Sequence, residues 1–403
     1  MGTTFLCVAS YFKGEKFMIG CKEAGCTVYL VTSKKHEDKA WPREHIDEIF
    51  YVQQDDNDNW KMDDVIAGLA YTMRNKRIDR IVALDDFDVE KAALLRETFR
   101  SPGMGQTTAR YFRDKLAMRM KAQEEGVPVP AFSSLFNDEQ VNHFIKTVPA
   151  PWVIKPRGEA SATGIRKIHS GDQLWEVIHQ LGGQRHNYLV EQFKPGDVYH
   201  VDALTFGGKQ VFVCVSKYVN TPMEVAHGGG IFRSYTIPHN TKEEKDFIKI
   251  NADVMNAFGM QYSASHTEFI KCHEDGKIYF LETASRVGGA NLSDMIEMAS
   301  GINLWYEWAK LEAAVANGKQ YAVPKAKKDY AGIIISLARE KHPNTTEFTE
   351  TEIVWRLHLD NHIGFIVKSN STERILALLD NYAQRIQRDY HASVPVPLRP
   401  RTS

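Results

Sequence analysis

The sequence lacks the features that would place the chain in a membrane or on nucleic acid. Its 403 residues contain no apolar run long enough to span a bilayer. The opening stretch "MGTTFLCVASYFKGEKF" has no basic start before an apolar segment of signal-peptide length, and Leu6 stands where a myristoylation signal needs Ser or Thr. The 50 basic residues are balanced by 51 acidic ones, without a Lys/Arg run that suits a phosphate backbone. We therefore expect no membrane and no nucleic-acid partner.

Cysteine is scarce as well, and its spacing excludes the common thiol sites. An odd number of scattered cysteines argues against a disulfide framework, and without C-x-x-C spacing they do not suggest zinc. We therefore expect reduced thiols in a cytoplasmic protein. The five positions are Cys7, Cys21, Cys26, Cys214 and Cys272.

The first hundred residues alternate short apolar runs with helical patterns. The runs "TFLCVAS", "CTVYLVTS" and "RIVALDD" predict strands, and the segments between and after them predict helices over 14–24, 63–75 and 89–99. Such alternation indicates a parallel sheet with crossover helices, which commonly binds ligands at the carboxyl ends of its strands. The acidic stretch "LDDFD" is equally compatible with a plain polar strand end. The stretch "SPGMGQTT" predicts the domain boundary.

The pattern changes beyond this boundary. One long amphipathic helix is predicted over 107–126, and period-two alternation from about 151 to 282 predicts an antiparallel region. The last eighty residues suggest a small α+β extension, whose Pro-rich end "SVPVPLRPRTS" predicts a disordered tail. Further helices are expected at 173–181, 242–258, 292–317 (divided at Gly301) and 372–386.

The hairpin "HTEFIKCHEDGKIYFLE" carries the clearest chemical signal. Glu268 and Glu282 lie on its two arms, an even number of residues apart around a turn near Asp275-Gly276. In such a hairpin the two side chains are near neighbours that can share a face. Adjacent carboxylates repel unless a cation lies between them, and hard oxygen ligands favour magnesium over zinc. Two unrelated glutamates on a solvated face are the alternative.

A magnesium pair implies phosphates, and the segment "PWVIKPRGEASATGIRKI" can bind them. A predicted strand ends at Lys155 and is followed by small residues up to Gly164, which allow backbone N–H groups to approach phosphates. The segment has neither the P-loop pattern G-x-x-x-x-G-K-[ST] nor the dinucleotide pattern G-x-G-x-x-G. An ordinary hairpin is the alternative reading of the segment.

These segments together resemble the ATP-grasp superfamily. Lys155, the small-residue loop, "VEQF", the glutamate pair and Arg286 follow the order typical of that family from about residue 104 to 320. The resemblance implies an α/β plus α+β architecture: a Rossmann-like pre-ATP-grasp domain, a two-lobed ATP-grasp fold and a small C-terminal α+β extension. The implied ranges are 1–103, 104–320 (lobes 104–195 with the small-residue lid and 196–320 with the metal and substrate sites) and 321–403.

The resemblance also implies roles for individual residues. Lys115 and Lys155 are the expected phosphate-binding lysines, and Glu268 and Glu282 the expected Mg²⁺ ligands. Arg286 and Lys155 are the expected catalytic residues, with Arg286 holding the substrate carboxylate or a developing oxyanion. The remaining expected ATP contacts are Ser161, Ala162, Thr163 and Gly164 in the lid, Glu191 and Phe193 at adenine, and either Asp197 or His200 at ribose.

One position departs from the family pattern. The family commonly has E-x-N-x-R, whereas this chain has Glu282-Thr283-Ala284-Ser285-Arg286. Because alanine cannot ligate a metal, Asn291 or water would have to replace the missing amide, or a single ion binds tightly. The number of Mg²⁺ ions, one or two, therefore stays open.

The implied activity is that of an ATP-dependent carboxylate-amine ligase. The γ-phosphoryl group of ATP would pass to a carboxylate, and an amine would then displace phosphate from the acyl phosphate to form an amide. The chain most resembles the amino-acid and dipeptide ligase branch, in which homodimers are frequent. The substrate candidates are Glu224, His227, Arg233, His266, Arg286, Gly288 and Gly289.

Other activities of this fold stay open at this stage. A carboxylase that activates bicarbonate uses the same ATP site, and a kinase would leave a stable phosphorylated product. A non-catalytic nucleotide-binding protein is the remaining alternative, to which the missing asparagine is the only pointer.

Overall fold

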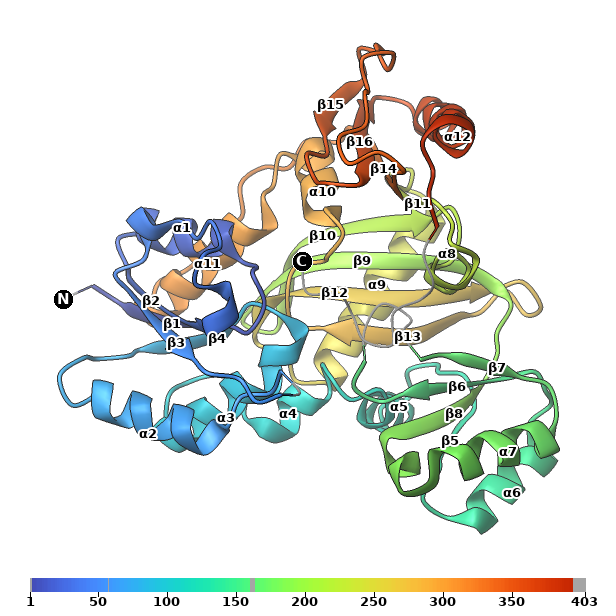
Figure 1. Cartoon of the computed structure of the whole chain (residues 1–403), viewed down its shortest axis with the longest axis horizontal. Helices are drawn as coiled ribbons and strands as arrows, with labels where there is room; N and C mark the ends of the chain where they lie inside the picture. The colour runs from blue at the N-terminus through green and yellow to red at the C-terminus, as the bar shows by residue number, and fades with distance from the viewer. Residues whose placement is uncertain (1, 57, 160–163, 394–403) are drawn as a thin grey trace.

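The computed structural model describes residues 2–56, 58–159 and 164–393, which form three sheets (Figure 1). The expected disordered tail and the lid residues Ser161, Ala162 and Thr163 therefore lie outside the described residues, except for Ser393 at the start of the tail. No helix of the described segments is long and apolar enough to cross a membrane.

The N-terminal sheet is parallel, as predicted, with the order β3-β2-β1-β4. Sequence patterning missed β3, a short edge strand with the sequence EIFYV whose five residues are all half-buried. The elements are β1 (Thr4–Ala9), α1 (Glu15–Glu23), β2 (Thr27–Ser33), β3 (Glu48–Val52), α2 (Met62–Thr72), β4 (Arg80–Ala83) and α3 (Val89–Phe99), with 3-10 turns at Lys34–His36, Arg43–His45 and Asp86–Asp88.

The single helix predicted over 107–126 is wrong, because the chain forms two helices there. These are α4 (Gln106–Arg110) and α5 (Lys115–Glu124). Asp114 lies between them and is the N-cap of α5, because its carboxylate accepts hydrogen bonds from the backbone N–H groups of Leu116 and Ala117. Lys115 thereby becomes the first residue of a helix.

A small lobe follows, built on a sheet of order β5-β8-β6-β7 with antiparallel neighbours. Its two helices pack on the sheet through a separate apolar core (Figure 1, lower right). Ser170 and Asn137 cap these helices through their side chains. The elements are β5 (Phe132–Ser134), α6 (Asp138–Thr147), β6 (Trp152–Pro156), β7 (Arg166–Ile168), α7 (Gly171–Leu181) and β8 (Tyr188–Gln192), with a 3-10 turn at Gly182–Asn187.

An antiparallel sheet of eight strands, ordered β13-β12-β9-β10-β11-β14-β16-β15, forms the centre of the molecule. β14 pairs directly with β11, so the strands of the expected C-terminal extension continue this sheet. The last helix, α12 (Thr372–Asp389), packs against them through its apolar face. The strands are β9 (Gly196–Phe206), β10 (Lys209–Tyr218), β11 (Phe232–Thr236), β12 (Tyr262–Cys272), β13 (Ile278–Ala284), β14 (Tyr330–Leu337), β15 (Ile353–Arg356) and β16 (His362–Ser369).

The remaining helices connect the central sheet to its neighbours. α11 packs against α1 of the N-terminal domain, with the rings of Phe17 and Trp308 4.7 Å apart. The contact is close enough that a Cβ on Gly20 would lie 3.0 Å from the Cβ of Ala309. This contact fixes the N-terminal sheet beside the central one. The helices are α8 (Pro222–Gly228), α9 (Lys242–Ala257), α10 (Leu292–Ser300) and α11 (Leu304–Ala316).

Candidate active site

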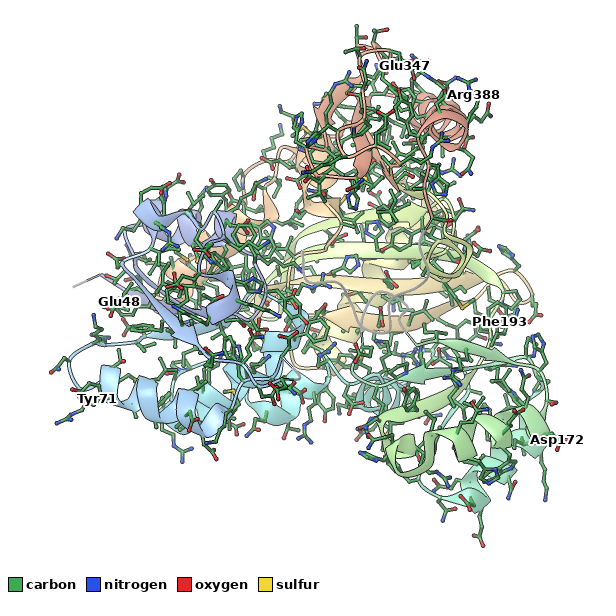
Figure 2. All side chains as sticks on the ribbon, viewed as in Figure 1. Glu48, Tyr71, Asp172, Phe193, Glu347 and Arg388 are labelled. Carbon is green, nitrogen blue, oxygen red and sulfur yellow. The ribbon has the colours of Figure 1, made fainter. Side chains whose placement is uncertain are left out.

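A cavity of about 690 Å³ is lined by residues from the small lobe, the central sheet and the N-terminal domain. Its volume lies in the range of small-molecule and cofactor sites. Figure 2 shows Phe193 near the junction of the small lobe and the central sheet. Ten of the sequence-predicted site residues line the cavity: Lys115, Lys155, Glu191, Phe193, Glu224, His266, Glu268, Glu282, Arg286 and Gly289.

The two predicted metal ligands are cross-strand partners. Glu268 on β12 pairs with Glu282 on β13 as predicted, beside a register shift between Glu268 and Phe269. Tyr218 donates its hydroxyl to Glu268 over 2.8 Å, and Lys115 lies 2.8 Å from a carboxylate oxygen of Glu282. Burial raises the pKa of Glu282, but Lys115 and Lys155 together hold this pKa below its usual value. Two neighbouring carboxylates on one wall form a hard-oxygen donor set that fits Mg²⁺.

The second lysine belongs to a buried row of charges. Glu191 lies between Lys155 and Arg119, accepting from Arg119 Nε over 2.9 Å and pairing with Lys155 through its other oxygen. Burial lowers the pKa of Lys155 to about 8, with Glu191 opposing the shift. Burial raises the pKa of Glu191, but Arg119 and Lys155 hold it below its usual value.

Arg119 was missed by sequence reasoning. It stands one helical turn after Lys115, on the same face of α5, and that spacing is the one signal that could have found it. Its side chain is fully buried, with the guanidinium 5.7 Å from the ring of Phe280. Both terminal guanidinium nitrogens lack a hydrogen-bond partner among the residues described. Arg119 therefore acts on the cavity through Glu191.

Arg286 meets a carboxylate from the N-terminal domain. Its guanidinium pairs with Asp86, a buried residue of the "LDDFD" stretch that also lines the cavity. Burial raises the pKa of Asp86, but Arg286, together with Arg113 and Lys13, lowers this pKa to about 2. Asp86 Oδ1 and Arg286 Nε are buried without a hydrogen-bond partner in the described parts of the chain. The hydrogen-bonding capacity of these two atoms is therefore not used by the described protein groups.

Several expected residues do not line the cavity. Asp197 pairs with Lys217 over 2.8 Å, and His200 is fully buried, so neither ribose candidate reaches the cavity wall. Arg233 pairs with Asp380 of α12, 2.6 Å away. Gly164 and Gly288 also lie outside the lining.

The substrate candidates on α8 are placed differently from one another. Glu224 lines the cavity, but its carboxylate accepts the backbone N–H of Thr221 as half of a capping box. One oxygen of the Glu224 carboxylate is therefore occupied in capping the start of α8. His227 belongs to the same helix, and its side chain lies outside the described structure.

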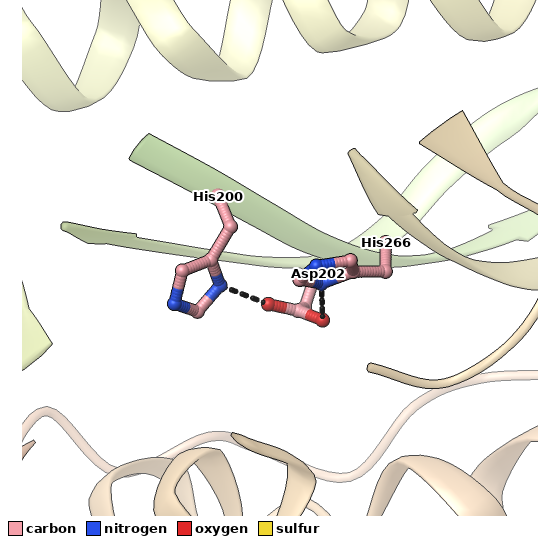
Figure 3. Close-up of side chains that lie close together, drawn as sticks. All are labelled: His200, Asp202 and His266. Carbon is pink, nitrogen blue, oxygen red and sulfur yellow. Dashed lines mark hydrogen bonds and ion pairs between the residues drawn. The ribbon is translucent and has the colours of Figure 1, made fainter. Parts of the chain in front are cut away.

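Figure 3 shows a buried cluster formed by His200, Asp202 and His266. Asp202 accepts hydrogen bonds from Nδ1 of His200 over 2.7 Å and from Nδ1 of His266 over 2.8 Å. Burial lowers the pKa of His266, but Asp202 and Glu268 together raise this pKa to about 10. His266 also lines the cavity, with Nε2 3.7 Å from Glu268. Sequence reasoning proposed both histidines but missed the aspartate that joins them.

Comparison with known proteins identifies the fold. Residues 148–294 match the family model of the ATP-grasp domain. The chain also superimposes on the crystal structure of an L-amino acid ligase from Bacillus licheniformis with a TM-score of 0.73 at 15% identity, covering 98% of this chain and 99% of that one. The chain therefore has the ATP-grasp fold, and the predicted resemblance to this superfamily is confirmed.

Two curated relatives are more similar in sequence. The chain is 29% identical to the L-arginine-specific L-amino acid ligase of Bacillus subtilis over 233 residues, which are 56% of each chain. It is 23% identical to a D-alanine–D-alanine ligase of Neisseria meningitidis over 182 residues, 45% of this chain and 59% of that protein. The chain thus spans somewhat more than half the length of these relatives.

Proposed function

We propose that the protein is an ATP-dependent carboxylate-amine ligase that joins two amino acids and releases ADP and phosphate. One observation carries the proposal: Lys115, Lys155, Glu268, Glu282 and Arg286 line a single cavity. Two lysines, two adjacent carboxylates and an arginine are the groups that phosphoryl transfer to a carboxylate requires. The similarity to amino acid ligases supports this substrate class.

Each group has a role in this proposal. Lys115 and Lys155 bind the phosphates, and Glu191 and Phe193 line the adenine end. Glu268 and Glu282 would hold Mg²⁺, which supplies charge neutralisation on the phosphates when bound. In the first step a substrate carboxylate oxygen attacks the γ-phosphorus, and the bond from that phosphorus to the ADP oxygen breaks.

The second step forms the amide. The amine nitrogen of the other substrate attacks the acyl carbon, the bond from this carbon to the phosphate oxygen breaks, phosphate leaves with the electron pair, and the proton lost by the nitrogen passes to the departing phosphate. Arg286 stabilises the negative charge on the acyl oxygen during this attack. Asp86 holds Arg286 in place from the N-terminal domain. Water must be excluded, because it hydrolyses the acyl phosphate.

The setting of the enzyme is part of the proposal. All five cysteines are free and buried, which suits a cytoplasmic location. A homodimer is the expected assembly, and small-molecule carboxylates and amines are the expected partners.

The test is release of ADP and phosphate by the purified protein with magnesium and ATP, against amino acids singly and in pairs, with mass spectrometry of the products. We expect release that needs two amino acids and a product mass equal to their sum minus water. Release that needs bicarbonate alone would instead indicate a carboxylase. A stable phosphorylated product would indicate a kinase, and ATP binding without turnover a nucleotide-binding protein.

A further inference from the structure

Strand pairing brings Asp202 and His266 together inside the central sheet. Asp202 on β9 stands directly opposite His266 on β12, and His200 stands opposite Glu268 in the same way. Asp202 and His200 are fully buried, whereas His266 retains contact with the cavity. The carboxylate of Asp202 therefore acts on the cavity only through its neighbours.

The hydrogen bond to Asp202 fixes how the imidazole of His266 is turned. Since Nδ1 donates to Asp202 over 2.8 Å, the other ring nitrogen faces the cavity beside Glu268. Gly288 closes over this contact, because a Cβ there would lie 2.8 Å from Asp202 Oδ1 and 3.0 Å from His266 Nδ1. Gly288 follows Arg286 by two residues, so the same backbone segment carries the arginine.

A metal does not account for the cluster. The potential ligand atoms of His200, Asp202 and His266 lie within 4.8 Å of one another, which is compatible with an ion. However, each histidine Nδ1 lies only 2.7 or 2.8 Å from a carboxylate oxygen, as in a hydrogen bond. Two ligands on one zinc ion, each about 2.0–2.1 Å from it in tetrahedral geometry, are separated by more than 3 Å. Direct hydrogen bonds therefore describe the cluster.

We infer that Asp202 is a positioning residue, which holds the His266 imidazole so that Nε2 contacts the anionic acyl phosphate between Glu268 and Arg286. This inference rests on the proposed ligase function. Buried partners of this kind fix ring orientation, and their loss commonly lowers activity about 10- to 100-fold. Asp202 is thus expected to influence the chemical step and not the affinity for ATP.

The test is a double-mutant cycle of Asp202→Asn and His266→Gln in the full-length protein. We expect Asp202→Asn to lower kcat for amide formation about 10- to 100-fold, with the Kd of ATP changed less than about twofold. If Asp202 acts through His266, the double variant is no slower than His266→Gln alone, within about twofold. A merely structural role of Asp202 would instead give losses that multiply.

Matched variants keep the result interpretable. Ser234→Ala removes the partner of His200 Nε2, 2.7 Å away at the far end of the network, and is expected to keep kcat within about threefold. Gly288→Ala perturbs the Asp202–His266 contact from the other side and replaces Asp202→Asn if that variant does not fold. A kcat unchanged by both Asp202→Asn and Gly288→Ala, or multiplying losses in the cycle, would overturn the inference.

Failure of the proposed function is visible separately, in the unmodified protein. If the wild type releases no ADP with any amino-acid pair, the ligase proposal fails, and the inference about the acyl phosphate fails with it. If the wild type is active and only the cycle gives multiplying losses, the ligase proposal stands and the role of Asp202 is refuted.

Discussion

Raising the pH should weaken ATP binding through Lys155. Burial lowers the pKa of this ammonium to about 8, so it is charged below pH 8 and loses its proton above. ATP phosphates favour the charged form, and the pKa of Lys155 is therefore higher in the complex than in the free protein. Binding above pH 8 must then take up a proton, which weakens the apparent affinity.

The expected size follows from this linkage. The Kd of ATP should be nearly constant between pH 6.5 and 7.5 and should rise about tenfold per pH unit above 8, until the pKa of the complex is reached. At pH 9 this corresponds to about 1.4 kcal/mol of lost binding free energy. Isothermal titration calorimetry at constant ionic strength measures both the affinity and the proton uptake, the latter from buffers of different ionisation enthalpy.

Lys155→Arg is the matched control, because arginine stays charged throughout this range. The variant is expected to bind ATP more weakly at pH 7 but without the break near pH 8. A wild-type affinity that stays constant from pH 7 to 9.5, or an equal slope in the variant, would refute the assignment of Lys155 to the phosphates.

Three further predictions concern the other charged groups of the cavity. Glu282→Ala removes a proposed magnesium ligand, so magnesium-dependent ATP turnover should fall by at least about 100-fold while circular dichroism stays native; near-normal turnover would remove the metal assignment. Arg119→Met removes one of the two buried cations beside Glu191, while Lys155 remains, and should lower the free energy of unfolding by about 1.5–3 kcal/mol in urea titrations; a loss below about 0.5 kcal/mol would contradict the pairing. Asp86→Asn leaves Arg286 without its counter-charge and should lower kcat/KM for the amino acid about 10- to 100-fold with ATP binding retained; an equal loss of ATP affinity would argue against a substrate-side role.

Local patterns were sufficient for much of the fold and for the metal wall. The even spacing of Glu268 and Glu282 around a tight turn predicts cross-strand neighbours, and the structure pairs them. The alternation of apolar runs with helical patterns predicts the parallel N-terminal sheet, and the period-two alternation of apolar and polar residues predicts the antiparallel region. These features depend on residues near one another in the chain, which is why the sequence alone reveals them.

Contacts between distant segments were not accessible in the same way. Asp86 and Arg286 are 200 residues apart, and Asp202 and His266 are 64 apart, so spacing carries no signal for either pair. In the sequence, Asp114 cannot be distinguished from the other polar residues of an amphipathic helix, although it caps a new helix that presents Lys115 to the cavity. The Asp86–Arg286 pair forms where the N-terminal domain meets the central sheet, and the Asp202–His266 pair forms where β9 pairs with β12.

The most direct test of the account is oxygen-isotope transfer during the reaction. An amino-acid substrate labelled with ¹⁸O in its carboxylate is incubated with magnesium, ATP and the second amino acid, and the released phosphate is examined by mass spectrometry. Because the attacking carboxylate oxygen leaves with the phosphate, the account predicts one ¹⁸O in each phosphate formed together with the amide. Unlabelled phosphate accompanying amide formation, or release of AMP in place of ADP, would contradict it.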